Sequence, residues 1–522
     1  MKKFYFVLSF LLLFFCGSLY AQISVEYFGG AGRVSGSCAL LKTEDMSIIV
    51  DCGNFYEEGG LPAYNDTIDK KLINADAMVL THAHNDHSGK IPLLINAGYR
   101  GKIYCTEATR KLLFETFDDG WNHSDIKQKY FWSKNSRLNI EKIHKGVLTL
   151  HWYYDCRKNI KNIEDIDKRQ SLNQLKTKYN IGMKLCKNCL KKELEKTQKY
   201  FIDVPYKDIT ELSEKVNFVL FDAGHITGSA SVFFNIYDDG KIKKVVFSGD
   251  LGTGLSKITP DKDIIPKADY VFIENTYGSG TRDVSFSNYE VFQRAISNAI
   301  KDNKIVWIPS LSMHRTQKIL YEIKQAQLKG LLNEDVPIYS LSPSSNGITK
   351  LYEKELKNPS SEKWFKDEVY EIGSFLPAKY ITQKQKNEEF AVPCIIISAS
   401  GMMNQGVSYS LLNKLLKLNN VEVFLVSYAA PQTPAGQLKK GTNTIKTKYG
   451  KMDVAAKINV FNIFSDHADS IELLRWLTNQ DANTQLYLVH GEKDVLKKAQ
   501  KNYKLKGFRN TKIAVIGEQV LK

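Results

Sequence analysis

Four side chains of metal-ligand type fall within six residues of this chain. The segment His82-Ala83-His84-Asn85-Asp86-His87 directly follows an apolar stretch at 77–80, which has the character of a short buried β-strand. A single buried histidine is usually a core residue. Three imidazoles and a carboxylate packed together would repel when charged, and burying them without a cation would cost hydration. A divalent ion removes this conflict, because it binds neutral imidazole and ionised carboxylate. The segment therefore predicts a metal centre.

The ligand types indicate which ions fit and how many. The turn can serve two ions, with His82 and His84 facing one and Asp86 and His87 facing the other. Imidazole and carboxylate without thiolate suit zinc first, with manganese or iron as alternatives. Two adjacent ions can hold a bridging hydroxide as nucleophile and orient a phosphodiester for displacement.

Three later positions offer the remaining ligands. Each follows an apolar, strand-like stretch and lies in a short glycine-containing turn: His225, Asp250 and His490. Strands that end in functional loops are how layered α/β enzymes build their sites. A carboxylate such as Asp250 can bridge two cations. Read singly, each of the three has an ordinary structural explanation.

The ordered set HxHxDH, His, Asp and distal His resembles the metallo-β-lactamase superfamily. Three further motifs narrow the resemblance to its β-CASP branch of RNA-processing nucleases: ENTYG at 274–278, FSDHAD at 464–469 and LVHGE at 488–492. Shorter segments resemble the domain that this branch inserts: Arg315-Thr316-Gln317, Ser400-Gly401-Met402 and Ala435-Gly436. The resemblance implies an α/β fold, a metallo-β-lactamase αββα sandwich with an inserted β-CASP α/β domain, and covers nearly all of the chain after residue 21 except about 130–195.

The implied domain boundaries follow from the order of these motifs. The expected sequence of segments begins with a signal peptide at 1–21. The metallo-β-lactamase domain then starts at 22–275, with a Lys-rich insertion at about 130–200, is interrupted by the β-CASP domain at 276–458 and is completed by 459–522.

The resemblance also implies roles for individual residues. The metal ligands would be His82, His84, Asp86, His87, His225, bridging Asp250 and His490. Asp51 would orient a metal-binding histidine, and Glu492 would orient His490. Glu274 is the acidic residue beside the site. His467 would protonate the leaving oxygen, because an imidazole held by a carboxylate titrates near neutrality; its structural alternative is a residue at a helix start.

Some positions depart from the branch pattern. After ENTYG, where an arginine and a histidine are often found, the chain continues Ser279-Gly280-Thr281-Arg282-Asp283 without histidine. Gln405-Gly406 stands where a glycine pair is expected, and Gln437 where an arginine is expected. These positions line the nucleic-acid groove in relatives, so they bear on the substrate rather than on the metal chemistry. His490 occupies the histidine position of the HGE motif, and in this respect the chain resembles the RNA-cleaving members of the branch.

The charge of the chain is compatible with an RNA substrate. The formal net charge is +15, with 27 Tyr and 26 Phe. Lysine and arginine displace counterions from nucleic acid and aromatic rings stack on bases, although a Lys-rich surface also simply aids solubility. The alternatives are a hydrolase of DNA or of a small phosphodiester, and a non-catalytic nucleic-acid-binding protein. A homodimer is the expected oligomer, if one forms.

The N-terminus predicts export. Lys2 and Lys3 precede an apolar run to Cys16, and the small residue Ala21 marks the expected cleavage site, which predicts a periplasmic or secreted protein. The run is too short to span a bilayer comfortably, and no later stretch is long and apolar enough. Cys16 raises the alternative of a lipoprotein, but the bulky Phe15 before it does not fit a lipobox.

The remaining cysteines divide into two sets. Four lie in apolar contexts typical of core residues: Cys38, Cys52, Cys105 and Cys394. Three others, with a histidine, could close a third, structural zinc site in the insertion: His151, Cys156, Cys186 and Cys189. A disulfide among these three cysteines and free thiols are the alternatives.

Overall fold

The computed structural model describes residues 23–56, 64–65, 67–122, 197–281, 286–359, 362–382, 389–448 and 450–521, without the side chains of 117–122 and 286–287. The predicted signal peptide and most of the predicted insertion lie outside the described residues. The same holds for the candidate third zinc site at His151, Cys156, Cys186 and Cys189.

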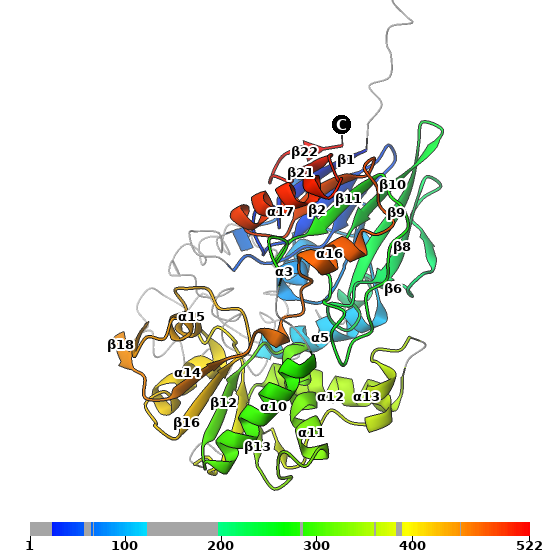
Figure 1. The fold of residues 1–522 in the computed structure, drawn as a ribbon. Coiled ribbons are helices and arrows are strands. Elements are labelled where there is room, and N and C mark those ends of the chain that lie inside the picture. Colours follow the sequence, from blue (N-terminus) through cyan, green and yellow to red (C-terminus); the bar gives the residue numbers. More distant parts are fainter. Residues whose placement is uncertain are drawn as a thin grey trace, which may run out of the picture.

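Two seven-stranded sheets form the centre of the larger unit (Figure 1). The first has the order β22 (Gln519–Val520), β1 (Ser24–Gly29), β2 (Cys38–Lys42), β3 (Ser47–Val50), β4 (Ala77–Val79), β5 (Lys102–Cys105), β6 (Phe201–Asp203). The second has the order β21 (Thr511–Ile513), β20 (Gln485–Val489), β11 (Tyr270–Glu274), β10 (Lys241–Phe247), β9 (Ala230–Asp238), β8 (Val216–Asp222), β7 (Ile209–Glu211).

Apolar side chains from both sheets meet in one core. Val25 and Leu41 of the first sheet pack in the same cluster as Phe218, Phe234 and Phe272 of the second. The outer faces are covered by helices. The first sheet packs against α4 (Ile91–Ala97) and α5 (Glu107–Asn122), and the second against α16 (Ser470–Trp476) and α17 (Lys493–Leu505). The predicted αββα sandwich is thereby confirmed.

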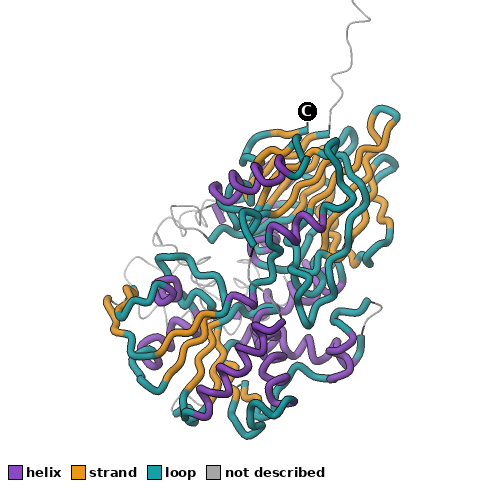
Figure 2. Tube along the Cα trace, viewed as in Figure 1, coloured by secondary structure: helices purple, strands orange, loops and turns teal. Residues whose placement is uncertain are grey.

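A third sheet forms a separate layer, with its strands side by side below the sandwich (Figure 2). Its order is β14 (Tyr380–Ile381), β13 (Ile338–Ser340), β15 (Cys394–Ser398), β12 (Ile305–Pro309), β16 (Val421–Leu425), β19 (Lys457–Val460), and every pair is parallel. We call residues 286–460, which contain this sheet, the inserted domain.

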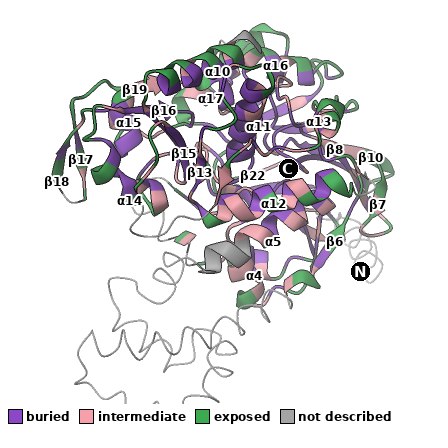
Figure 3. Ribbon diagram, turned by 90° about the horizontal axis from the view of Figure 1, so that it is seen from below, coloured by how far each residue is buried: buried purple, intermediate pink, exposed green. Residues whose placement is uncertain are grey.

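Helices cover both faces of the third sheet. One face packs against α10 (Phe286–Lys301) and α11 (Arg315–Leu328), and the other against α14 (Gly406–Leu415) and α15 (Pro434–Lys439). The domain also contains α12 (Pro343–Lys357), α13 (Asp367–Ile372) and a hairpin of β17 (Thr444–Thr447) and β18 (Gly450–Asp453). The central strands β15, β12 and β16 are buried, while the outward side of α10 is exposed (Figure 3). This is the α/β layer arrangement expected of an inserted domain.

Two further findings concern the described residues alone. No helix among them combines the length and the apolar character required to cross a membrane. The four cysteines predicted to be core residues are buried and carry free thiols: Cys38, Cys52, Cys105 and Cys394.

Candidate metal centre

The HxHxDH segment leaves the sandwich at the end of β4. Its last residues form α3 (Asn85–Ser88), a single turn that carries Asp86 and His87. The turn lies against Gly53, where an added Cβ would be 1.6 Å from the carbonyl oxygen of Asp86. The amide of Cys52 donates to the carbonyl of His87 at 2.7 Å. The close approach that glycine permits therefore holds the ligand-bearing turn against the sheet.

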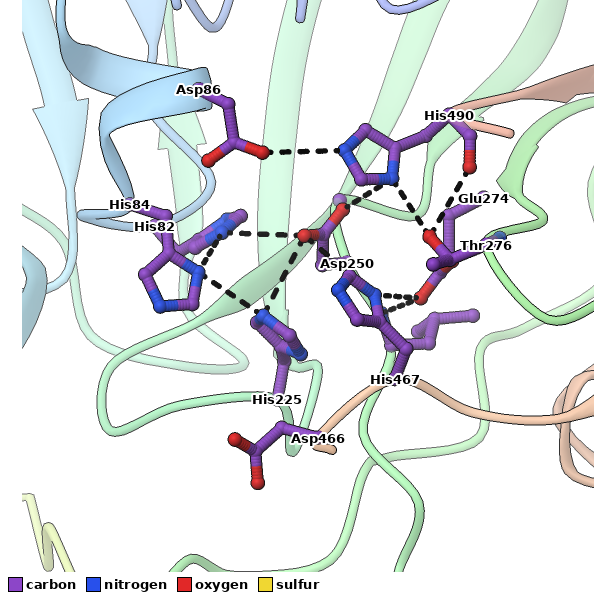
Figure 4. A network of polar contacts seen from close by, with 12 residues as sticks. His82, His84, Asp86, His225, Asp250, Glu274, Thr276, Asp466, His467 and His490 are labelled. Carbon is purple, nitrogen blue, oxygen red and sulfur yellow. Dashed lines mark hydrogen bonds and ion pairs between the residues drawn. The ribbon is translucent and has the colours of Figure 1, made fainter. Parts of the chain in front are cut away.

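One group of candidate ligands consists of His82, His84, His225 and Asp250, whose ligand atoms all lie within 4.8 Å of one another (Figure 4). Nδ1 of His84 is 3.1 Å from Nε2 of His82 and 3.2 Å from Nε2 of His225. A tetrahedral zinc ion with Zn–N bonds of about 2.0 Å separates its ligand nitrogens by about 3.3 Å. The spacing of the three imidazoles fits such an ion.

A second group consists of Asp86, His87 and His490. Nε2 of His490 lies 3.4 Å from Nε2 of His87 and 3.7 Å from Oδ2 of Asp86. The division of the HxHxDH segment between the two groups is the one expected from the sequence, with its two leading histidines on one side and its Asp-His pair on the other.

Asp250 lies between the two groups. Its Oδ2 is 3.6 Å from Nε2 of His82 and 3.5 Å from Nε2 of His225. Its Oδ1 is 3.3 Å from Nε2 of His87 and 3.4 Å from Nδ1 of His490. This Oδ1 is buried and accepts no hydrogen bond from the part of the chain that the structure describes. A buried carboxylate oxygen in this situation requires a compensating charge. Each oxygen faces one group, which is the arrangement of a carboxylate that spans two cations.

The electrostatics favour metal binding. Burial lowers the pKa of His82 and His225 well below the ordinary value, and it also lowers the pKa of His84, so these imidazoles are neutral near pH 7. Burial opposes ionisation of Asp250, yet His490 and His87 hold its pKa well below the usual range. In the first group, neutral imidazoles beside an ionised carboxylate are the protonation states that a divalent ion needs. His87 of the second group differs, because against the effect of burial Asp250 and Asp51 raise its pKa well above the ordinary value.

Asp51 orients His87 of the second group. Its Oδ2 accepts a 2.7 Å hydrogen bond from Nδ1 of His87, which leaves Nε2 of that ring directed at Asp250. Asp51 is itself fixed by the backbone amide and the hydroxyl of Thr81, both at 2.8 Å. Asp51 and His490 have positive φ angles of 62° and 47°. Such backbone is uncommon outside glycine, and it concentrates at functional sites.

His467 lies at the edge of the centre, with 21% of its side chain exposed. Its Nδ1 is 3.0 Å from Oε1 of Glu274 and 3.9 Å from Oδ2 of Asp250. Burial alone would lower the pKa of His467, but Glu274 and Asp250 raise it to about 8. With Asp250 and His490 it also forms a third group of ligand-type side chains. The geometry thus allows a proton-donor role and a ligand role for His467.

Three partners of the ligand histidines were not predicted from the sequence. The hydroxyl of Thr276 is 3.0 Å from Nδ1 of His490, and that of Thr81 is 3.0 Å from Nδ1 of His82. Ser37 Oγ is 3.3 Å from Nε2 of His87. Thr276 lies within the ENTYG motif and Thr81 directly before the first ligand, so their position in the chain was the available signal.

One sequence expectation changes. Glu492, expected to orient His490, is exposed and precedes α17; the ring of His490 is contacted by Thr276, Asp86 and Asp250 instead. Glu492 occupies the N-cap position of α17, where its side chain is exposed. Gln437, at a position expected to hold arginine, uses its amide to bind the backbone of Lys446 at 2.7 and 3.0 Å.

Fold and site together define a metal-dependent hydrolase. The sequence pattern of the metallo-beta-lactamase superfamily matches residues 31–305, more than half of the chain. The Beta-Casp domain pattern matches 316–438, and that of the Zn-dependent metallo-hydrolase RNA specificity domain matches 451–514. The chain belongs to the metallo-β-lactamase superfamily, in its β-CASP branch.

Three relatives illustrate the extent of the similarity. An RNase J-like protein of Methanocaldococcus jannaschii is 27% identical, over 90% of this chain and 93% of its own length. Ribonuclease TTHA0252 of Thermus thermophilus is 26% identical, over 94% of this chain and 98% of its own. The transcription termination factor FttA of Methanosarcina mazei is 26% identical, over 91% of this chain and 68% of its own.

Proposed function

We propose that this chain is an exported ribonuclease that uses two zinc ions, with His467 as general acid. The observation that carries the proposal is Asp250, whose two oxygens face two separate groups of histidines while His467 lies 3.9 Å away. Two of the relatives are named as ribonuclease or RNase J-like, and the third matched pattern is an RNA specificity domain.

The candidate ligands divide between the two proposed ions. His82, His84 and His225 would hold one ion, Asp86, His87 and His490 the other, and Asp250 would span both. When bound, two such ions supply an activated water nucleophile and neutralise phosphate charge. Asp51 fixes the ring of His87 in the tautomer that offers Nε2.

His467 is the proposed proton donor. Glu274 accepts the Nδ1 proton, so any proton passed to the substrate has to come from Nε2. Against the effect of burial, Glu274 and Asp250 raise the pKa of His467 to about 8, which favours the protonated ring at neutral pH. A donor in this state can protonate the leaving oxygen of a phosphodiester, a contribution of about 10² to 10⁴-fold in rate.

The proposed activity is tested with end-labelled RNA and DNA of one sequence, incubated with purified protein with and without chelator. RNA cleavage that chelator removes and zinc restores is expected, with slower or no cleavage of DNA. The Asp250→Asn variant serves as the inactive control. Preferential cleavage of DNA, or cleavage that persists in Asp250→Asn, would contradict the proposal.

Salt dependence separates a polymer substrate from a small one. An enzyme that neutralises several phosphates along RNA loses affinity steeply with salt, whereas one acting on a small phosphodiester does not. We expect KM for RNA to rise at least about tenfold between 50 and 200 mM salt. A flat dependence would favour a small phosphodiester as the substrate.

Export is tested separately. The charged and apolar N-terminus motivates cleavage after Ala21, so the secreted or periplasmic protein should begin at Gln22. Mass spectrometry of the protein from fractionated cells measures this directly. A full-length chain in the cytoplasmic fraction would refute export while leaving the hydrolase proposal in place.

A further inference from the structure

A buried ion cluster joins the inserted domain to the segment that carries His467. Oδ2 of Asp466 lies 3.3 Å from Nη2 of Arg315, and Oδ1 of Asp466 contacts Nζ of Lys318. The three side chains are at most 7% exposed. Arg315 and Lys318 belong to the first turn of α11, whereas Asp466 immediately precedes His467 in the chain. The cluster therefore links two domains one residue away from the proposed proton donor.

The charges in this cluster depend on one another. Burial opposes ionisation of Asp466, but Lys318 and Arg315 hold its pKa well below the ordinary range. Burial likewise opposes the charge on Lys318, but Asp466 raises its pKa. Removing one partner from a buried pair leaves an uncompensated charge, which is strongly destabilising.

The inserted-domain side of the cluster is anchored to the third sheet. Nη1 of Arg315 donates a 2.8 Å hydrogen bond to the carbonyl of Val426, just beyond the end of β16. On the other side of His467, the amide of Ala468 donates to the carbonyl of Leu251 at 2.7 Å. His467 thus lies between one anchor to the inserted domain and one anchor to the sandwich.

We propose that Asp466, held by Arg315 and Lys318, is a positioning residue that fixes the imidazole of His467 at the metal centre. The inserted domain then sets the geometry of proton donation, in addition to any contact it makes with the substrate. The inference rests on the proposed role of His467 as general acid. The ion pairs and the hydrogen bond that hold the cluster involve no proposed metal ligand, although the charge of Asp466 also acts on His225.

The test compares two leaving groups. Protonation by a general acid matters for the poor alkoxide leaving group of RNA, but little for the p-nitrophenolate of bis(p-nitrophenyl) phosphate, which departs unprotonated. Asp466→Asn keeps the size of the side chain and removes its charge. The double variant Asp466→Asn/Lys318→Met also removes one stranded cation, so it guards against a simple folding defect.

A matched control exists elsewhere between the same domains. Lys111 of α5 and Glu355 of α12 form a 3.0 Å ion pair that also joins the sandwich to the inserted domain. Lys111→Met breaks this pair without touching the segment that carries His467. It should leave both reactions within about threefold of wild type, as expected when no acid–base group is displaced.

In zinc-loaded Asp466→Asn and in the double variant, kcat for RNA should fall about 10- to 100-fold, with KM and the p-nitrophenyl reaction within about threefold of wild type. Equal losses for both substrates would overturn the proposal, because they indicate damage to the metal centre or the fold. Unchanged kcat for RNA would overturn it as well.

Hydrogen exchange provides a readout that needs no substrate. Amide exchange in the peptide 464–470 of the zinc-loaded protein should become faster in Asp466→Asn and not in Lys111→Met. Unchanged exchange there would overturn the positioning role even if wild type proved inactive on RNA. Inactive wild-type protein, by contrast, would refute the proposed function itself, so the two failures are distinguishable.

Discussion

Nδ1 of His467 donates a 3.0 Å hydrogen bond to Oε1 of Glu274, a side chain with no exposed surface. The same carboxylate accepts the backbone amides of Leu251 at 3.0 Å and Thr276 at 2.9 Å. Three donors therefore fix its orientation. The pair has the character of a carboxylate-held imidazole, in which the carboxylate selects the tautomer and stabilises the charged ring.

Replacing Glu274 by glutamine should impair catalysis with little change in metal content. The amide keeps the size of the side chain but no longer stabilises the charged imidazole, so we expect kcat for RNA to fall about 10- to 100-fold. His467→Ala should lose more, about 10² to 10⁴-fold, and also keep its metal. Metal analysis accompanies the kinetics, because loss of metal in His467→Ala would make His467 a ligand.

Replacing Asp250 should lower the metal content of the centre. Both of its oxygens face histidine groups, so Asp250→Ala removes one ligand from each proposed ion. We expect metal content to fall from about two ions per chain to less than one, together with loss of activity. Elemental analysis after gel filtration measures this. A fully metallated, active variant would show that Asp250 is not a ligand.

Thr276 should tune metal affinity through His490. Its hydroxyl lies 3.0 Å from Nδ1 of that ring, and partners of this kind typically affect metal affinity or activity about 10- to 100-fold. Thr276→Val removes the hydroxyl at nearly constant volume, whereas Thr276→Ser retains it and serves as control. Competition with a chelator measures the affinity, and equal affinities for the two variants would contradict the role.

Gly53 should tolerate no side chain. A Cβ there would lie 1.6 Å from the carbonyl oxygen of Asp86, which is backbone and has no freedom to rotate away. Gly53→Ala should therefore destabilise the protein by about 3 kcal/mol and lower metal content, as overpacking of a rigid site does. Gly280→Ala is the control, since no atom of the described residues lies within 4 Å of its added Cβ. Equal stability of the two variants, from denaturant titration, would refute this reasoning.

The sequence predicted much of this architecture because functional motifs follow strands. The apolar stretch at 77–80 appears as β4, that at 270–273 lies within β11, and that at 486–489 lies within β20. The two leading histidines and the Asp-His pair of the first motif divide as their order indicates. Short motifs of this kind encode local geometry, which is why sequence reasoning could reach them.

Contacts that depend on tertiary packing were harder to predict from the sequence. Asp466 and Lys318 are separated by 148 positions, and neither has a local signal that identifies the other as its partner. Glu492 follows His490 closely in sequence, but its side chain is exposed at the start of α17. Nearness in the chain would therefore have identified one partner, Thr81 beside His82, but failed for Glu492, whereas the ends of neighbouring strands located the ligands themselves.

Asp222 should make stability depend on pH. Burial raises the pKa of its carboxyl to about 8, and the neighbouring Asp263 adds to the shift. Its ordinary pKa is about 3.9, so the folded state binds this proton more tightly than the unfolded state. The resulting stability is fully present below about pH 4 and is lost as pH rises through about 8.

Asp222→Asn cannot ionise, so its free energy of unfolding relative to wild type should increase from pH 5 to pH 9. Denaturant titrations at both values measure the difference, with Asp239→Asn in the exposed turn after β9 as the matched control. A difference that stays constant with pH, or one that Asp239→Asn reproduces, would show that Asp222 does not titrate in this range.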